Sequence, residues 1–303
     1  MERKAFIDSR QEVICMSLNK RFSFSNLLIY TFLTVFALLI LIPVWHIFVI
    51  SISSPSVYMT DPYHLIPKSF SLAEYKRAFY SIGGIARALL ISVEITGLGT
   101  ALSMFLSCCG AYTLSKRDLP GRSVLFRILV FTMFFNGGLV PFYILVRNLK
   151  LSDTILALTL PVALSTYNLI IMKNYFAGLP VSLEESAKID GYNDIQILYK
   201  IIIPISKPII AAISLFYAVA YWNDYFMATL FISSNDMFPL QIVLRQMIVQ
   251  NMVLAQVGVQ TSGSNPEQFK MACIIIGIIP VLCVYPFVQK YFTKGIMLGA
   301  VKE

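Results

Sequence analysis

Charged side chains between residues 182 and 204 have the types and spacing of a recognition element. Glu184, Glu185, Lys188 and Asp190 lie close together, and Gly191 follows them directly. Charges of this kind fix the register of a helix that lies in a groove of a partner, while an apolar strip supplies the affinity. A segment of this kind can bind a partner or rest on a membrane surface, and its residues do not indicate catalysis.

A short helix is predicted to carry these charges. Ser182 followed by Glu185 fits a capping box, in which the hydroxyl accepts a hydrogen bond from a free amide and the carboxylate reaches back to the cap amide. Glu184 and Lys188 are one turn apart, in the order that favours an ion pair. Gly191 then supplies the permissive backbone that ends a helix.

A second short helix is predicted after a turn at Asp190 and Gly191. Asn193 and Gln196 repeat a weaker capping signal, and Pro204 interrupts the apolar stripe that follows. A helical hairpin with an apolar edge fits two interpretations: it rests on a membrane surface, or it docks into a partner. The predicted stripe consists of Ile195, Leu198, Ile201 and Ile202.

The composition around this hairpin is that of an integral membrane protein. Hydrophobic residues make up 57% and charged residues 13% of the 303 residues, and the mean hydropathy is +0.72. The run 27–50 has no formal charge and is longer than the hydrophobic region of a signal peptide, so it is predicted to be a retained span. Further runs at about 85–114, 123–146, 154–178, 207–232 and 269–291 predict an all-α protein with six transmembrane helices.

The distribution of basic residues predicts how these spans are oriented. Cytoplasmic loops retain positive charge, and most of the 24 Lys and Arg residues fall in the two tails, the second-to-third loop and the hairpin region. Both termini and the hairpin, at about 180–206, are therefore predicted to be cytoplasmic. The predicted organisation is a tail over 1–25, a domain of six transmembrane helices over 26–292 and a tail over 293–303.

Other chemistries find little support in the sequence. It contains no Gly-Lys-Ser or Gly-Lys-Thr phosphate loop, so the chain is not expected to hydrolyse a nucleotide in the P-loop manner. The five cysteines fall in the predicted cytoplasmic tail or in spans and indicate neither a disulfide nor a metal site. His46 and His64 are interpreted as structural. The net charge of +8 is explained by topology, and nucleic-acid binding is not expected.

Polar side chains inside the spans are candidates for a translocation pathway, because an ionisable group at membrane depth usually faces a cavity or a partner helix. Glu94 lies inside the second span with no Lys or Arg within a turn of it. It either hydrogen-bonds across a helix interface or lines the pathway. The other candidates lie towards the outer end of the fifth span, where an aromatic belt is the alternative explanation: Tyr221, Trp222, Asn223 and Asp224.

The spacing within the hairpin is similar to a family motif. The pattern resembles the EAA loop of ABC-importer permease subunits. It consists of Glu185-Ser186-Ala187, Gly191 after a gap of three residues, Ile201 after a gap of nine, and Ile203-Pro204 after a gap of one. Ser186 replaces the commoner alanine, one small residue for another. In that family the loop is the coupling helix, which sits in a groove of the ATPase subunit. The resemblance implies an ATPase-coupling role for Glu184, Glu185, Ser186, Ala187, Lys188, Asp190, Gly191, Ile201, Ile203 and Pro204.

The resemblance extends over most of the chain beyond residue 20 and is strongest to carbohydrate-uptake permeases of the maltose-transporter type. It implies a type I ABC-importer permease fold in a bacterial plasma membrane and import of a sugar or oligosaccharide. The implied partners are a second homologous permease, two ATP-binding subunits that use ATP and Mg, and an extracytoplasmic solute-binding protein; this chain would bind no cofactor. The supporting stretches are AYTLSKRDLPGR at 111–122, VPFYILVRNLKLSDT at 140–154, YWNDYF at 221–226 and YFTKGIMLGAVK at 291–302.

Two other classes remain open from the residues alone. A secondary transporter driven by an ion gradient more often has inverted repeats and midplane ion-coupling residues, which are not apparent here. A membrane scaffold would not require a coupling hairpin. The outer segment 233–268 is longer than a connection needs, and the apolar spacing within 239–257 predicts a surface helix. The family resemblance makes this segment a candidate for contact with the implied solute-binding protein.

Overall fold

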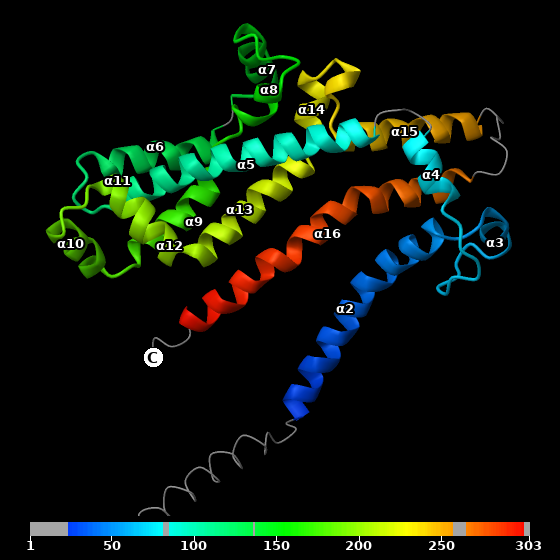
Figure 1. The fold of residues 1–303 in the computed structure, drawn as a ribbon, viewed down its shortest axis with the longest axis horizontal. Coiled ribbons are helices and arrows are strands. Elements are labelled where there is room, and N and C mark those ends of the chain that lie inside the picture. Colours follow the sequence, from blue (N-terminus) through cyan, green and yellow to red (C-terminus); the bar gives the residue numbers. More distant parts are fainter. Residues whose placement is uncertain (1–23, 81–84, 136, 257–264, 300–303) are drawn as a thin grey trace, which may run out of the picture. The chain divides into compact units, whose positions relative to one another are not determined.

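The computed structural model describes residues 24–80, 85–135, 137–256 and 265–299 (Figure 1). Every regular element among these residues is helical, which confirms the predicted all-α class. The chain divides into two compact units, with the boundary between Phe70 and Ser71. Residues 1–23 of the predicted N-terminal tail lie outside the described residues.

The first unit consists of a long apolar helix, a short helix and a loop. α2 runs from Phe24 to Ser51, and α3 runs from Pro55 to Thr60. His64 is buried, and its Nε2 lies 2.8 Å from the Ser53 hydroxyl. His46 Nε2 lies 3.3 Å from a loop carbonyl. These contacts hold the loop to the end of α2, in agreement with the structural interpretation of both histidines.

Three helices of the described chain are long and apolar enough to cross a membrane singly. They are α2, α5 (Ile85–Ser115) and α16 (Pro266–Gly299). Two bent pairs satisfy the same criterion when each pair is taken together, so the described residues hold three to five candidate spans. The pairs are α6 (Arg122–Phe134) with α7 (Leu139–Asn148), and the helical segment 194–205 with α13 (Lys207–Trp222).

The predicted fourth span, 154–178, is divided into two helices. α8 covers Ile155–Thr159, and α9 covers Thr166–Ala177. Pro161 lies in the break, where it lacks the amide that a continuing helix needs, and Ser165 caps α9. At 1.5 Å per residue α9 is about 18 Å long, which is less than the about 30 Å of the hydrocarbon core.

Small residues and buried hydroxyl groups join the helices at the core of the second unit, where α5 packs against α9 and α13 (Figure 1). Gly99 of α5 faces the ring of Tyr221 on α13, and a Cβ at this position would lie 2.7 Å from that ring. Ser103 Oγ lies 2.9 Å from the Tyr221 hydroxyl, and Ser107 Oγ lies 2.8 Å from the Tyr217 hydroxyl. Close approach and paired hydroxyls fix α5 against α13.

The two ends of α5 contact different elements (Figure 1). Near its N-terminal end, α15 (Leu240–Gln256) packs on α5 and α16, and α4 (Ala73–Tyr80) packs on α16. The Leu240 amide donates a hydrogen bond to Ser92 Oγ of α5 at 2.8 Å. α15 confirms the helix predicted within 239–257. At the C-terminal end of α5 lie the helices of the predicted hairpin.

Candidate functional site

The first helix of the hairpin is present but begins before its predicted cap. α10 runs from Val181 to Ile189, with Pro180 at the N-cap position. Ser182 is exposed inside the first turn, so its predicted capping role is wrong. The fixed φ of proline, −58° at Pro180, suits the entrance to a helix, and the chain becomes helical directly after it.

α10 ends in the turn that Gly191 was predicted to provide. Gly191 has a φ of +83°, in the left-handed region that favours glycine. Its amide donates to the Lys188 carbonyl at 3.1 Å, and the Tyr192 amide donates to the Ala187 carbonyl at 3.0 Å. Together these bonds form a Schellman motif, which satisfies the last carbonyls of the helix. The predicted turn is confirmed, and the backbone fixes its direction.

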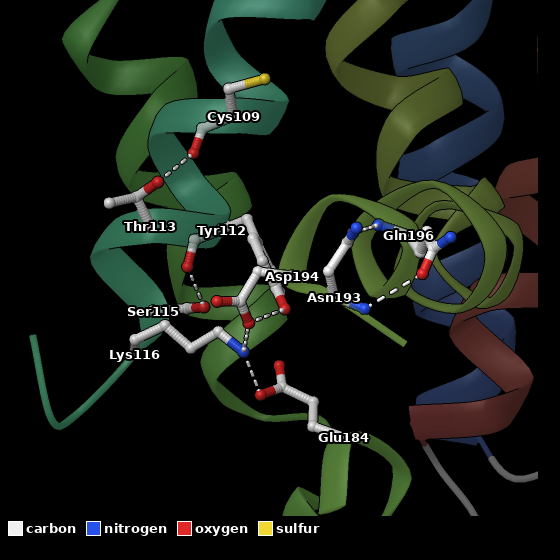
Figure 2. Close-up of polar contacts among 9 residues, drawn as sticks. All are labelled: Cys109, Tyr112, Thr113, Ser115, Lys116, Glu184, Asn193, Asp194 and Gln196. Carbon is white, nitrogen blue, oxygen red and sulfur yellow. Dashed lines mark hydrogen bonds and ion pairs between the residues drawn. The ribbon is translucent and has the colours of Figure 1, made fainter. Parts of the chain in front are cut away.

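The second helix begins with the predicted capping box. α11 covers Asp194–Ile197; the Asn193 side chain accepts from the Gln196 amide at 2.9 Å, and the Gln196 side chain accepts from the Asn193 amide at 3.0 Å (Figure 2). A π-helical turn, Leu198–Ile202, leads into α12, Ile203–Ile205, and the chain then bends by 89° into α13. The wider π turn accommodates the proline of α12, whose ring would clash with a carbonyl of a regular α-helical turn.

One face of the hairpin packs into the core of the second unit. The residues at its centre are Ala187, Ile197, Leu198 and Ile202, which are buried with residues of α5. The predicted apolar stripe is divided between the two faces: Leu198 and Ile202 are buried, Ile201 is half-buried and Ile195 is exposed. The hairpin is therefore attached to the transmembrane helices by packing as well as by the chain.

The opposite face of the hairpin is uncovered. Ile189 at the tip is 86% exposed and Ile195 is 70% exposed. Large apolar side chains this exposed, surrounded by charge, are typical of a surface that binds a protein partner. The other predicted coupling residues lie as follows: Glu185, Ser186, Lys188, Asp190, Gly191 and Pro204 are exposed, and Ile201 and Ile203 are half-buried.

A cluster of charged side chains joins both hairpin helices to the C-terminal end of α5 (Figure 2). The ammonium of Lys116, which directly follows α5, contacts the Glu184 carboxylate of α10 and lies 3.7 Å from the Asp194 carboxylate of α11. It also lies 4.2 Å from the centre of the Tyr112 ring, and the Tyr112 hydroxyl donates to Asp194 at 3.4 Å. Lys116 and Glu184 are only 22% and 23% exposed, so water screens this pair less than a fully exposed one.

This cluster corrects one prediction and adds two residues. Glu184 pairs with Lys116, so the predicted pairing of Glu184 with Lys188 is wrong. Within the part of the chain that the structure describes, neither Lys188 nor Glu185 has an ion pair, which leaves both charges available to a partner. Sequence reasoning missed Lys116 and Tyr112 as site residues. Two signals pointed to them: Lys116 is a basic residue that directly follows a long apolar run, and both residues lie in the stretch 111–122 that supports the family resemblance.

The candidate pathway residues divide into exposed and buried ones. Glu94 lies on an uncovered face of α5, where Leu90 and Leu98 are also exposed, and Asn223 is exposed directly after α13. Tyr221 and Trp222 are buried: the Tyr221 hydroxyl donates to the Thr159 carbonyl at 3.3 Å, and the Trp222 indole donates to the Gly277 carbonyl at 3.1 Å. Burial makes these two aromatic residues part of the helix packing, and their polar atoms already have partners within the chain.

Asp224 has a local role in the chain. The predicted fifth span, 207–232, divides after Trp222, and α14 follows at Phe226–Phe231. The Asp224 carboxylate accepts a hydrogen bond from the Met227 amide at 3.0 Å, in the first turn of α14. A carboxylate at this position satisfies a free amide of the helix and interacts favourably with the helix dipole.

A comparison with known families gives a match over most of the chain. Residues 16–297 match the family described as "Binding-protein-dependent transport system inner membrane component". The chain belongs to this family. As a permease it is the multi-pass inner-membrane transport component of an ABC system and is not itself the ATPase. Membership in the permease family decides between the three classes that the residues left open, because the matched family depends on a binding protein.

Named relatives and a solved structure extend the comparison. The chain is 48% identical to the "Polygalacturonan/rhamnogalacturonan transport system permease protein YtcP" of Bacillus subtilis (strain 168), over 91% of this chain and 98% of the relative. It is 28% identical to the "Arabinooligosaccharides transport system permease protein AraQ" of Halalkalibacterium halodurans, over 70% of this chain and 72% of that relative. The crystal structure of a bacterial ABC transporter involved in the import of the acidic polysaccharide alginate contains a similar chain. Its TM-score to this chain is 0.80 and its sequence identity is 35%, over 89% of this chain and 99% of the other. The fold is therefore that of an ABC-importer permease.

Proposed function

We propose that this chain is one of two homologous permease subunits of an ATP-driven importer of oligosaccharides in a bacterial plasma membrane. Its proposed partners are the second permease, two ATP-binding subunits and an extracytoplasmic solute-binding protein. The ATP-binding subunits bind ATP and Mg, and this chain binds no cofactor. The saccharide class is supported by the printed names of the relatives, which specify transport of polygalacturonan, rhamnogalacturonan, arabinooligosaccharides or alginate.

The single observation that carries this proposal is the two-faced hairpin at the end of α5. Its exposed face presents Ile189 and Ile195 beside the unpaired charges of Glu185 and Lys188, which suits docking into a groove of an ATP-binding subunit. Its buried face is packed against α5 and fixed by Lys116. A movement of the docked subunit would therefore be transmitted to α5 through contacts that already exist within this chain.

The proposed topology has six crossings of the membrane, with both termini and the hairpin on the cytoplasmic side. α2, α5 and α16 supply three crossings, and the α6–α7 pair supplies another. α13, which has 16 residues, is assigned the crossing that follows the hairpin. The fourth crossing is assigned to α9. Because α9 is shorter than the hydrocarbon core, α8 and the segment that joins it to α9 span the remaining thickness of the membrane. Irregular backbone at membrane depth is tolerated where protein or an aqueous cavity surrounds it, which is the environment expected beside a translocation pathway.

We also propose that Glu94 and Asn223 contribute to the translocation pathway. Removing the charge-assisted hydrogen bonds of Glu94 to saccharide hydroxyls, by Glu94→Ala, should lower transport about tenfold or more at unchanged complex yield. Glu94→Gln, which keeps hydrogen-bonding capacity, should lose less. Both are measured as uptake per assembled complex in proteoliposomes. If uptake per complex is unchanged while yield and thermal stability fall, Glu94 instead joins helices and the pathway assignment is withdrawn.

The function itself is tested by reconstituting the complete transporter in proteoliposomes. We expect uptake of at least one of trigalacturonate, arabinotriose or maltotriose that requires both ATP on the hairpin side and the solute-binding protein on the other side. Uptake that persists without ATP and collapses when an ion gradient is dissipated would support a gradient-driven transporter. The complete absence of uptake of all three sugars, in a complex that hydrolyses ATP, would count against oligosaccharide import.

A further inference from the structure

A pocket of about 820 Å³ is lined in part by Arg87 and Ala88, at the N-terminal end of α5. The hairpin lies at the opposite end of this helix (Figure 1). Side chains from α5, α14, α15 and the segment between α14 and α15 line the pocket. The volume is within the about 300–1,000 Å³ that is usual for small-molecule sites. In the proposed topology the N-terminal end of α5 faces the solute-binding protein, where a substrate arrives.

The polar groups of the pocket centre on one guanidinium. Arg245 of α15 lies over the ring of Tyr225, with 4.2 Å between the guanidinium carbon and the ring centre. Stacking on an aromatic face holds an arginine in place while its N–H groups remain free at the edge. Arg245 has no carboxylate partner among the described residues. Its positive charge is therefore uncompensated within the described chain.

The other charges of the pocket are already paired. Arg87 of α5 donates from Nε to the Asp236 backbone carbonyl at 2.8 Å and lies 3.9 Å from the Asp236 carboxylate. This contact ties the start of α5 to the α14–α15 connection and leaves a single excess positive charge in the pocket, on Arg245. A site with one preorganised guanidinium is suited to one carboxylate, which arginine binds through two parallel hydrogen bonds.

Amide and apolar groups complete the pocket. Gln246 and Gln250 line it from the same helix as Arg245, and Asn235 lines it from the segment between α14 and α15. Side-chain amides donate to and accept from hydroxyl groups. The apolar part of the lining includes Ile242 and Met247. This combination of amides, an arginine and an apolar surface is suited to a ligand with many hydroxyl groups, apolar ring faces and a carboxylate.

The rim of the pocket is held in place from outside. Asp153, which follows α7, accepts hydrogen bonds from the amides of Ser233 and Ser234, both at 3.0 Å, and from the Ser234 hydroxyl. These bonds hold the pKa of the Asp153 carboxyl below its usual value, so it remains an acceptor at neutral pH. The segment that carries Asn235 and Asp236 is thereby fixed before any ligand binds, which reduces the entropy cost of binding.

We propose that this pocket is a subsite for an acidic saccharide, and that Arg245 binds the carboxylate of a uronic acid residue. The inference rests on the proposed import function and narrows its substrate to oligosaccharides that contain uronates. A carboxylate side chain of the solute-binding protein is the competing occupant. The pocket is concave, is large enough for a sugar residue and has three side-chain amides besides Arg245, which favours a saccharide. A carboxylate side chain of a docked protein would need only the guanidinium as its binding partner.

The test compares an acid with its neutral ester on the complete transporter in nanodiscs. The probes are α-1,4-linked trigalacturonate and its fully methyl-esterified form, with affinity measured by titration in the absence of the solute-binding protein. We expect the parent to prefer the acid, and Arg245→Gln to weaken binding of the acid about tenfold while leaving the ester unchanged. Arg147→Gln, which removes an exposed arginine in the last turn of α7, should change neither.

Three outcomes would overturn the subsite. The parent shows no preference for the acid; Arg245→Gln weakens the acid and the ester equally; or Arg245→Gln leaves the saccharides unaffected and weakens docking of the ligand-free solute-binding protein. ATP-driven uptake of arabinotriose or maltotriose, with no binding of trigalacturonate, would reject the subsite while retaining the proposed import function. Failure of every uptake assay would instead reject the function itself.

Discussion

Replacing Gly191 with valine should leave the transporter assembled and reduce its transport about five- to thirty-fold. Gly191 has a φ of +83° in the Schellman turn between α10 and α11, and a Cβ there would meet no atom within 4 Å. The penalty is therefore backbone strain of about 1–2 kcal/mol. A strain of this size lowers the population of the native turn, relative to alternative backbone conformations, about five- to thirty-fold. Relief of the strain should rotate α11 away from α10 and deform the proposed docking face.

Gly121 supplies the matched control for this substitution. Its φ is +77°, and a Cβ there would also meet no atom within 4 Å, but it lies before α6 and outside the hairpin. We expect Gly121→Val to cost similar stability with transport per complex retained. The measurements are complex yield, ATP hydrolysis stimulated by loaded binding protein, and uptake. Equal losses of uptake in the two variants would show that strain anywhere in the chain has this effect, and the coupling role of Gly191 would be abandoned.

The parts of the hairpin that could be predicted from the sequence are those decided by neighbouring residues. A glycine was needed where the turn requires a positive φ, and the Asn193–Gln196 capping box involves residues three apart in the chain. The Ser182 signal was equally local and failed, because Pro180 two positions earlier already starts the helix. A capping motif predicts a helix start only when no stronger start precedes it.

The features that could not be predicted depend on residues distant in the chain. Lys116 and Glu184 are 68 positions apart, and no periodicity within either segment indicates that they meet. The hydrophobic run 154–178 did not indicate where its helices begin and end. An apolar run indicates that a segment is buried, but it does not show that the segment forms a single unbroken helix. The burial of Tyr221 and Trp222 likewise follows from the packing of α13 on α5 and α16, which periodicity alone does not reveal.

Reversing the charge at position 116, by Lys116→Glu, should uncouple ATP hydrolysis from transport. The substitution removes the ammonium group that contacts Glu184 and lies near the Asp194 carboxylate. It also brings a third carboxylate into the cluster. The lost attraction and the new repulsion together are worth about 2 kcal/mol in a partly shielded site, or a factor of about thirty. The hairpin would still dock on the ATP-binding subunit through its exposed face, so hydrolysis should persist while uptake per ATP falls by an order of magnitude.

Arg117→Glu and a charge exchange separate this mechanism from a general effect of charge. Arg117 is exposed at the same end of α5, so its reversal should leave uptake per ATP near the parent value. Combining Lys116→Glu with Glu184→Lys restores opposite charges across the junction and should recover part of the coupling lost in each single variant. Recovery is expected to be incomplete, because Asp194 then faces a like charge at position 116. If the exchange recovers complex yield but not uptake per ATP, the pair stabilises the fold without transmitting movement, and the hairpin must act on α5 through its apolar packing alone.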